Sequence, residues 1–451
     1  MQTNFRPEQL ADPDVRESEK ILRACVHCGF CTATCPTYVL LRDELDSPRG
    51  RIYLIKHMLE NGRVTPRIVE HIDRCLSCLS CMTTCPSGVH YMHLVDHARA
   101  YIEKHHRRPL PERLLRRLLA TVLPRPALFR ASLLLGRLAR PLAPLLPGRL
   151  AALVEQQPRH LPAPSWADRP QVLRPEGPRR ARVAVLPGCV QQVIEPAINE
   201  ATVRLLLRTG VEVVVPKISC CGALAHHLGM EEAARRTAAR AVRAVVAAHR
   251  TEALDAFVVN ASGCGVVVRD YGFMFREDPE LAGDAATVSG LMRDVSEFLV
   301  ELGLPERAVD VDLTVAFHAP CSLQHGLRAA APAKRLLTEL GLTVREPAES
   351  HLCCGSAGTY SILQPALARR LRARKSGHLA ATGADLVATA NIGCLEWLQG
   401  ADGLPVVHVV QLADWLTGGP VPAAIAHLAD RARPRRPRTV AAPASPQVAV
   451  S

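Results

Sequence analysis

Two runs of cysteine in the first hundred residues have the spacing of iron–sulfur ligands. In each run, three cysteines are separated by two residues, and a fourth follows after three more and directly precedes a proline. Proteins that hold two [4Fe–4S] clusters use this run of ligands. The sequence therefore predicts two [4Fe–4S] clusters. The runs are Cys25-x2-Cys28-x2-Cys31-x3-Cys35-Pro36 and Cys75-x2-Cys78-x2-Cys81-x3-Cys85-Pro86.

The fourth cysteine of each run is expected to ligate the cluster of the other run. The first three cysteines wrap one face of a cubane in a tight loop, whereas the fourth begins a helix that points away. The proline behind it suits a first helical turn, where its missing N–H is no loss. We assign one cluster to Cys25, Cys28, Cys31 and Cys85, and the other to Cys75, Cys78, Cys81 and Cys35.

A pair of structural zinc sites is the alternative, since CxxC pairs are common zinc ligands. Zinc knuckles use two such pairs per metal and need neither the third cysteine nor the closing Cys-Pro. The complete run occurs twice, which favours iron–sulfur clusters. It also argues against a zinc-stabilised scaffold that binds nucleic acid, for which an aromatic content of 4% leaves few stacking platforms.

A second set of eight cysteines forms an internal repeat. A single cysteine, a Cys-Cys-Gly and another single cysteine recur 130 to 133 residues later. Both adjacent cysteines can ligate one cluster, and the glycine lets backbone approach closely. Four thiolates per half are enough for one cluster in each. The two sets are Cys189, Cys220, Cys221 and Cys264, and Cys321, Cys353, Cys354 and Cys394.

Short buried-type strands lead into the single cysteines of this repeat. In open α/β sheets, ligands bind beyond the carboxyl ends of the strands, so each half is expected to gather its thiols at such an edge. Alternating β-branched and Ala/Leu/Arg-rich runs predict parallel-sheet α/β units. The expected strands are residues 183–186, 257–260, 314–319 and 386–391.

The chain therefore divides into five parts. We expect an α+β and α/β fold, with an N-terminal helical two-[4Fe–4S] ferredoxin-like domain followed by a duplicated α/β cysteine-rich domain. Residues 101–180 are rich in Leu, Arg and Pro, and prolines 109, 111, 124, 126, 141, 144 and 147 predict short helices there. The parts are 1–100 (ferredoxin-type), 101–180 (helical linker), 181–310 and 311–428 (cysteine-rich repeats), and 429–451 (disordered tail).

Composition narrows the setting of the protein. The chain has 451 residues and 16 cysteines, and its start lacks the pattern of a secretory signal, so a cytoplasmic protein without a disulfide framework is expected. No run of 18 apolar residues is present to span a bilayer. The formal net charge of +12 comes mostly from residues 101–160, with 12 Lys/Arg against three Glu.

That basic segment, residues 113–153, admits three interpretations. In the first, the segment lies on an anionic membrane surface. In the second, it docks a flavoprotein partner. In the third, it packs on its own domains with its arginines reaching water. Charge alone does not separate them.

Several other side chains lie near the cysteines in sequence. Three cations lie on the helix expected after a capping Ser47: Arg49, Arg51 and Lys56. They either stabilise negatively charged clusters, bind an acidic surface of a partner, or form a solvated helix face. Five histidines near the Cys-Cys-Gly segments either tune or ligate a cluster or pack as ordinary core histidines: His226, His227, His318, His325 and His351.

The chain resembles the iron–sulfur subunit of bacterial glycolate oxidase (glycolate dehydrogenase), of the superfamily that combines a ferredoxin domain with cysteine-rich (CCG) domains. The resemblance covers nearly the whole chain. Its most specific stretches are residues 22–38, 43–56, 353–360 and 391–394.

The resemblance implies a non-flavin electron-transfer subunit that is inactive alone. It would work beside two flavin-binding subunits, which carry the FAD, in oxidising glycolate to glyoxylate, and would pass electrons toward a respiratory acceptor such as quinone. It leaves open a peripheral position on the inner face of the cell membrane. The absence of a dinucleotide fingerprint or P-loop in the sequence agrees with flavin chemistry on other chains. The alternatives are the same relay for glycerol 3-phosphate or lactate oxidation, or a heterodisulfide reductase-like protein.

One departure concerns the cysteine-rich repeats. The fullest form of the motif, in heterodisulfide reductases, ends in CxxC and supplies a fifth ligand, but Val267 and Trp397 stand at that position here. The repeats are therefore expected to hold one or two further four-ligand clusters, or to act through their thiols without one.

Overall fold

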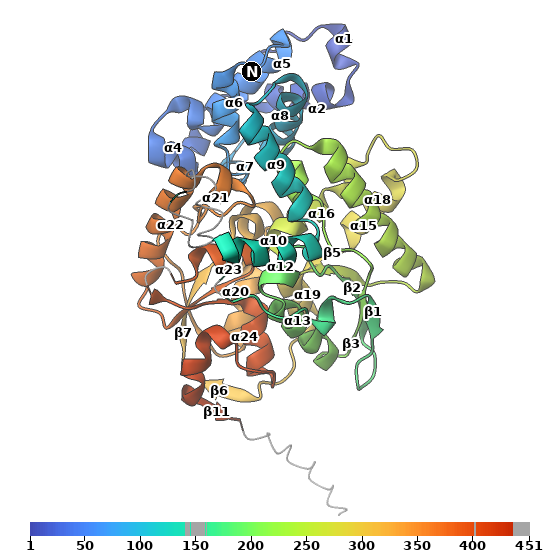
Figure 1. The fold of residues 1–451 in the computed structure, drawn as a ribbon, viewed down its shortest axis with the longest axis vertical. Helices are drawn as coiled ribbons and strands as arrows, with labels where there is room; N and C mark the ends of the chain where they lie inside the picture. The colour runs from blue at the N-terminus through green and yellow to red at the C-terminus, as the bar shows by residue number, and fades with distance from the viewer. Residues whose placement is uncertain (140–144, 146–157, 159, 401–402, 436–451) are drawn as a thin grey trace, which may run out of the picture.

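The computed structural model describes residues 1–139, 145, 158, 160–400 and 403–435. The N-terminal hundred residues form a helical domain at the top of Figure 1, and two α/β halves lie below it. Its helices are α1 (Pro7–Leu10), α2 (Pro13–Ala24), α3 (Phe30–Ala33), α4 (Pro36–Leu41), the 3₁₀ turn η1 (Glu44–Asp46), α5 (Pro48–Asn61), α6 (Pro66–Asp73), α7 (Ser80–Thr84) and α8 (Tyr91–His105).

Helix α5 confirms the helix that the sequence predicts between the two cysteine runs. The Ser47 side chain accepts a hydrogen bond from the backbone N–H of Gly50, and Pro48 occupies the first turn. Its buried residues, including Ile52, Ile55 and Met58, pack with residues of α2, α6 and α8 in the apolar core of the helical domain.

Two short helices in the Leu/Arg/Pro-rich segment confirm that proline divides it. Helix α9 (Leu110–Val122) ends before Pro124, and α10 (Pro126–Ala139) begins at the next proline. Leu115 and Leu119 of α9 pack against Leu228 and Leu363, one from each half, so α9 crosses both. Prolines 141, 144 and 147 fall outside the described residues.

The two halves repeat one sheet topology, which confirms the predicted duplication. The first sheet has the order β1-β3-β2-β4-β5 and the second β10-β9-β7-β8. Without β1, each is four parallel strands in which the strand that leads to the first cysteine pairs on both sides. The strands are β1 (Gln171–Leu173), β2 (Ala181–Val185), β3 (Val211–Val215), β4 (Ala256–Val259), β5 (Met292–Asp294), β7 (Thr314–His318), β8 (Thr343–Arg345), β9 (Leu386–Thr389) and β10 (Val406–His408).

Helices cover the faces of both sheets, as the βαβ connections require. In the first half they are α12 (Gln191–Ile194), α13 (Ala197–Arg208), α14 (Ala223–His227), α15 (Glu231–Thr251), α16 (Ser262–Arg269), α17 (Tyr271–Met274), α18 (Ala282–Leu291) and α19 (Val295–Leu302). In the second they are the π-helical turn η4 (Ser322–Leu327), α20 (Ala330–Glu339), α21 (Tyr360–Leu363), α22 (Pro365–Ala380), α23 (Ile392–Leu398) and α24 (Val409–Leu416).

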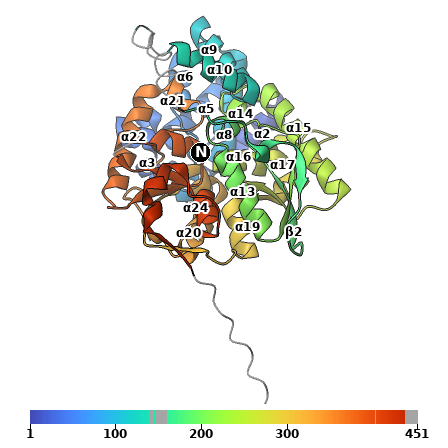
Figure 2. The same ribbon diagram turned by 60° about the horizontal axis from the view of Figure 1, so that its bottom comes forward.

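The halves meet through α13 and α24, which lie side by side in Figures 1 and 2. Asp414 on α24, with a side chain 1% exposed, receives hydrogen bonds from Arg204 and Arg208 on α13. A single apolar core runs through both sheets and includes Leu79 of the helical domain. The sites at the sheet edges are therefore held rigidly relative to one another.

Two expected boundaries are wrong. Strand β1 and the 3₁₀ turn η3 (Trp166–Asp168) lie in the segment assigned to a helical linker, yet β1 pairs antiparallel with β3. At the other end, residues of the expected disordered tail continue the turn η6 (Ala423–Arg431) into β11 (Ala432–Pro434), which pairs with β6 (Val309–Val311). Both edge strands are only three residues long, too short for a periodic pattern. Residues 436–451 of that tail fall outside the described residues.

The glycine of each Cys-Cys-Gly has the geometry that its motif suggests. Gly222 and Gly355 have φ values of +89° and +95°, where only glycine is unstrained. A Cβ on Gly222 would lie 2.9 Å from the carbonyl oxygen of Ala234 on α15, and a Cβ on Gly355 would lie 2.6 Å from that of Ala368 on α22. Each glycine therefore lets a long helix pack directly on the cysteine turn.

We expect Gly355→Ala to lower the free energy of unfolding by about 1–3 kcal/mol, the usual cost of a strained backbone position. Gly377→Ala is the control: Gly377 is exposed on α22 with no atom within 4 Å of its would-be Cβ. It should stabilise by about 0.5–1 kcal/mol through helix propensity. Anaerobic urea denaturation measures both, and effects of the same sign would contradict this account.

Candidate functional site

The two cysteine runs of the helical domain fold into loops of one shape. His27 and Gly29 in the first run and Ser77 and Leu79 at the matching places in the second all have positive φ. Left-handed backbone is unusual at a leucine, so its use at Leu79 shows that the loop shape is imposed by the site. The short helices α3 and α7 follow the two loops and contact each other.

The thiols gather in the crossed sets that the spacing suggests. One hollow is lined by Cys25, Cys28, Cys31 and Cys85, and a second is lined by Cys35, Cys75, Cys78 and Cys81. Cys81 also borders the first hollow, so the two sets adjoin.

The expectation about the two prolines holds for only one of them. Pro36 opens α4 directly after Cys35. Cys85 instead ends α7, and Pro86 lies in a turn ahead of α8. The fourth cysteine thus reaches the other set without needing to start a helix.

The donor set fits an iron–sulfur cluster. Burial raises the pKa of the Cys78 and Cys81 thiols well above their ordinary value, and raises the pKa of Cys31 to about 11. Thiols of this kind become thiolates when a metal takes the place of the proton. All 16 cysteines are described, and all are free of disulfides.

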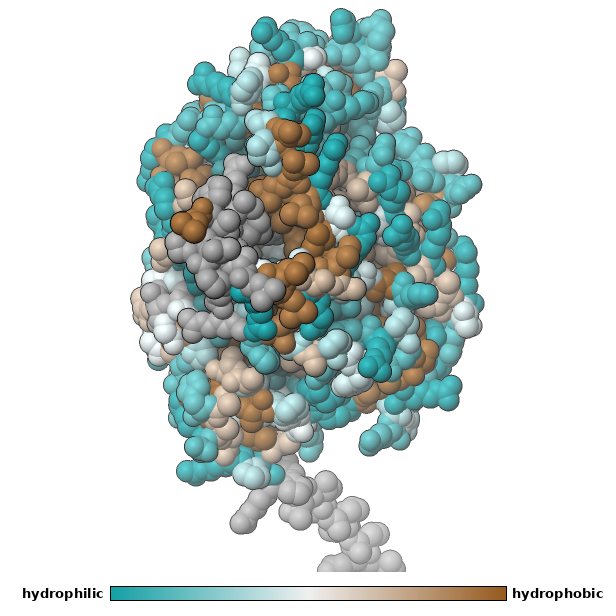
Figure 3. Space-filling model, viewed as in Figure 1, coloured by the Kyte–Doolittle hydropathy of each residue, from teal (hydrophilic) through white to brown (hydrophobic). Residues whose placement is uncertain are grey.

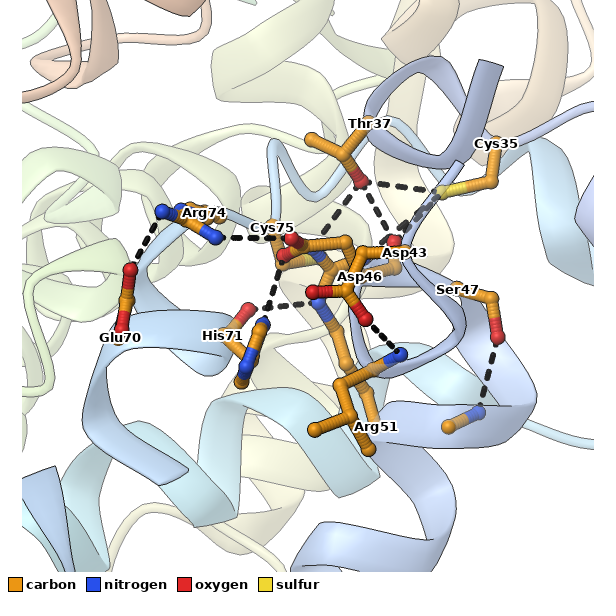
Figure 4. A network of polar contacts seen from close by, with 12 residues as sticks. Cys35, Thr37, Asp43, Asp46, Ser47, Arg51, Glu70, His71, Arg74 and Cys75 are labelled. Atoms are coloured by element: carbon orange, nitrogen blue, oxygen red, sulfur yellow. Dashed lines mark hydrogen bonds and ion pairs between the residues drawn. The ribbon is translucent and has the colours of Figure 1, made fainter. Parts of the chain in front are cut away.

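A buried ion-pair network fixes the loop that carries Cys35 (Figure 4). Arg51 of α5, with a side chain 1% exposed, pairs with Asp46 at 3.1 Å, and Arg74 pairs with the other oxygen of that carboxylate at 2.9 Å. Arg51 also donates to the Cys35 Sγ at 3.7 Å and to the His71 carbonyl at 2.7 Å. Arg51 therefore places a positive charge directly at a predicted ligand.

The other two cations that the sequence singles out are paired with carboxylates, one exposed and one partly buried. Arg49 donates to Glu44 at 2.5 Å, and Lys56 lies 3.0 Å from Glu60. Of the three, only Arg51 is buried beside sulfur.

The eight cysteines of the repeat all line one cavity of about 1180 Å³. The single cysteines follow β2, β4, β7 and β9, as expected, and the Cys-Cys pairs follow β3 and β8. The carboxyl ends of both sheets border this one cavity. The cavity is also lined by apolar residues of α9 and α10, including Leu119, Val122 and Phe129. Sequence reasoning missed this common cavity, because a repeat carries no signal of how its halves are turned toward each other.

Within each half the sulfur atoms lie close together. Hydrogen bonds with Cys189 and Cys221 lower the pKa of Cys220, and a hydrogen bond links Cys221 to Cys264. In the second half, the Sγ atoms of Cys321 and Cys353 are 3.7 Å apart, and those of Cys354 and Cys394 are 3.6 Å apart.

The backbone N–H of each motif glycine donates to the first sulfur of its own turn. The distance is 3.3 Å from Gly222 to Cys220 and 3.4 Å from Gly355 to Cys353. Four clustered thiols with N–H donors fit a cluster in each half. At the place of a fifth ligand, Val267 is buried, and the Trp397 indole donates to the Cys354 carbonyl at 3.0 Å.

The sites of the helical domain and of the second half adjoin. Cys78 packs in one core with Cys353 and Tyr360, and Cys321 packs against it. The Tyr360 hydroxyl donates to the Arg74 carbonyl at 3.1 Å. Three sets of thiols therefore follow one another, from the first hollow through the second to the second half.

The candidate histidines differ in their contacts. His226 lies 3.1 Å and His227 3.8 Å from Asp96, and His325 contacts the Thr83 hydroxyl at 2.8 Å and the His351 carbonyl at 3.1 Å. His318 is 1% exposed beside Cys354 and Cys394, and burial lowers its pKa to about 3.

Two exposed apolar features mark the surface. Beside the exposed Cys28, Val26 and Phe30 are 67% and 64% exposed. Leucines of α9 and α10 form the brown stripe on the front of Figure 3. They are Leu110, Leu114, Leu118, Leu128, Leu134 and Leu135.

Among the described helices, none has the length and apolar character of a membrane-spanning segment.

Comparison with protein families matches two models. Residues 24–89 match the 4Fe-4S dicluster domain, and residues 183–269 and 315–399 match the cysteine-rich domain. The ferredoxin-like and duplicated cysteine-rich parts predicted from the sequence are thereby confirmed, and with them the binding of iron–sulfur clusters.

Two curated relatives match about nine tenths of this chain, and a third matches half of it. The glycolate oxidase iron-sulfur subunit of Escherichia coli (strain K12) is 44% identical over 92% of this chain and 98% of its own length. The probable glycolate oxidase iron-sulfur subunit of Bacillus subtilis (strain 168) is 31% identical over 89% of this chain and 94% of its own length. Lactate utilization protein A of Shouchella clausii (strain KSM-K16) is 27% identical over 51% of this chain and 97% of its own.

A solved structure, that of a hypothetical protein from Helicobacter pylori, shares the fold. The TM-score is 0.54 with 10% sequence identity, and the match covers 91% of this chain and 74% of the other.

We expect Arg51→Met to lower the free energy of unfolding by about 3–5 kcal/mol, because it leaves the buried Asp46 carboxylate without one of its partners. Lys20→Met, which breaks an exposed pair with Glu17 on α2, should change it by no more than about 0.5 kcal/mol. Anaerobic denaturation of the cluster-containing protein provides both values. Similar losses for the two variants would show that the network is not what holds the loop.

Proposed function

The chain belongs to the family of glycolate oxidase iron–sulfur subunits, and we propose that it relays electrons from reduced flavin on partner subunits to a respiratory acceptor during oxidation of glycolate to glyoxylate. The observation that carries this proposal is the unbroken succession of thiol sets, in which Cys78 packs directly against the second-half cysteines. A chain of adjoining sites is what a relay requires.

We assign one [4Fe–4S] cluster to each crossed set of the helical domain, and one to each cysteine-rich half where four thiols converge. When bound, such a cluster accepts and releases single electrons at a potential that its protein surroundings set. The protein contributes thiolates, N–H donors to sulfur and the buried Arg51 charge, and it excludes water from the second hollow.

The two ends of this succession suit different partners. At one end the exposed Cys28 with Val26 and Phe30 forms an apolar edge where a flavin-binding subunit can dock close to the first set. At the other end, the cavity of about 1180 Å³ has room for a small acceptor, and its apolar lining from α9 and α10 suits a quinone.

A peripheral position on the inner face of the cell membrane has support in the stripe of exposed leucines on α9 and α10. Arg117 and Arg125, both exposed, flank these leucines and suit an anionic lipid surface. The same helices line the cavity, so membrane contact would bring a lipid-soluble acceptor to its mouth.

The crossed assignment predicts the outcome of serine substitutions. Cys35→Ser should disturb the spectrum of the cluster held by Cys75, Cys78 and Cys81, because Cys35 lines their hollow. Cys85→Ser, the matched variant, should disturb the other one. Electron paramagnetic resonance of the reduced proteins separates the two, and damage by Cys35→Ser confined to the set of its own run would refute the crossing.

The relay predicts that the purified chain alone does not oxidise glycolate, because its sequence carries no dinucleotide fingerprint for a flavin of its own. Dye reduction with glycolate measures this, and adding the flavin-binding subunits should restore activity. Turnover by the chain alone at the rate of the assembled complex would overturn the relay.

A further inference from the structure

The two cysteine-rich halves carry different residues at the buried position three residues before the first cysteine. His318 is the last residue of β7, three residues before Cys321. The matching residue in the first half, three before Cys189, is Leu186, which is 1% exposed. A site duplicated in every cysteine has thus acquired an imidazole in one half only.

The surroundings of His318 are those of a metal ligand. One of its ring nitrogens and the Sγ atoms of Cys354 and Cys394 all lie within 4.8 Å of one another. Two thiols and an imidazole at this spacing fit the ligands of a metal site.

Among the residues that the structure describes, neither buried nitrogen of this ring has a hydrogen-bond partner. A buried polar group without a partner is costly, and natural proteins rarely keep one without a use. The nearby His325 shows the ordinary solution, since each of its nitrogens has a partner.

We propose that His318 is a nitrogen ligand of the iron–sulfur centre in the second half, binding iron together with Cys354 and Cys394. This rests on the proposed function, which assigns a cluster to that half. The imidazole adds a neutral nitrogen ligand to the four thiolates of that half. The first half has four thiolates alone, so the two centres differ in ligand set and therefore in midpoint potential.

The test uses the full-length chain purified without oxygen and compares His318→Leu with His318→Cys. Leucine restores the residue of the first half and fills the space, whereas cysteine leaves a gap but offers a ligand. His318→Leu leaves the four-thiol set of the first half, so ligation predicts that about four irons remain in this centre but that its midpoint potential and spectrum shift. It also predicts that His318→Cys keeps that iron at a lower midpoint potential, because an anionic thiolate replaces a neutral imidazole. If His318 only packs, His318→Leu leaves the midpoint potential and the spectrum unchanged.

Two controls complete the experiment. His325→Gln should leave iron content and potential unchanged, and the spectra of the helical-domain clusters report in every variant that the chain is folded. Retention of the wild-type midpoint potential and spectrum in His318→Leu overturns the ligand assignment alone. If the wild-type chain holds no more than the roughly eight irons of two [4Fe–4S] clusters, the proposed centre fails together with its ligand.

Discussion

Every site in this chain depends on bringing sulfur atoms from distant segments together in surroundings that penalise their charge. Burial raises the thiol pKa, so thiolates persist only beside a metal or a compensating group. In the helical domain that compensation is built on Asp46, a carboxylate with no exposed surface that holds both Arg51 and Arg74. Three elements, α5, η1 and α6, meet on this one group, and Arg51 extends from it to Cys35. The loop of one run and the segment leading into the other are thereby fixed in one arrangement.

The duplicated halves show a second answer to the same constraint. There the sulfurs receive backbone N–H groups at Gly222 and Gly355, in a turn that only glycine permits. Both turns, their covering helices and the parallel strand order are repeated, so what is shared is the means of gathering four thiols. The halves differ at the buried residue three positions before the first cysteine, which is Leu186 in the first half and His318 in the second. The scaffold is therefore conserved between the halves where it positions sulfur, and it diverges where a second group tunes or completes the site.

Much of this arrangement follows from sequence because the cysteines carry strong local spacing. The strands before Cys189, Cys264, Cys321 and Cys394, the cap at Ser47 and the duplication are all readable, since each depends on neighbouring residues. The shared cavity is not readable, because it depends on how α13 meets α24, a contact made by Arg204 and Arg208 with a single buried Asp414. Strands β1 and β11 were missed because three residues at a sheet edge give no period. His318 could be named as a candidate, but only its missing partners separate it from four other histidines.

The helical domain places its second set of thiols against one half only, so the two halves have unequal positions in the proposed relay. Its second hollow faces the second half, where Cys78 packs with Cys353 and Tyr360. Its contacts with the first half include polar pairs, such as His93 with Asp270 at 2.8 Å and His226 with Asp96. In the proposed relay, electrons therefore leave the helical domain through the second half, because electron transfer slows steeply with distance, and the first half lies across the cavity that both halves line. A small acceptor in that cavity would lie between two centres of different ligand sets, which is a suitable place to collect two electrons that arrive one at a time.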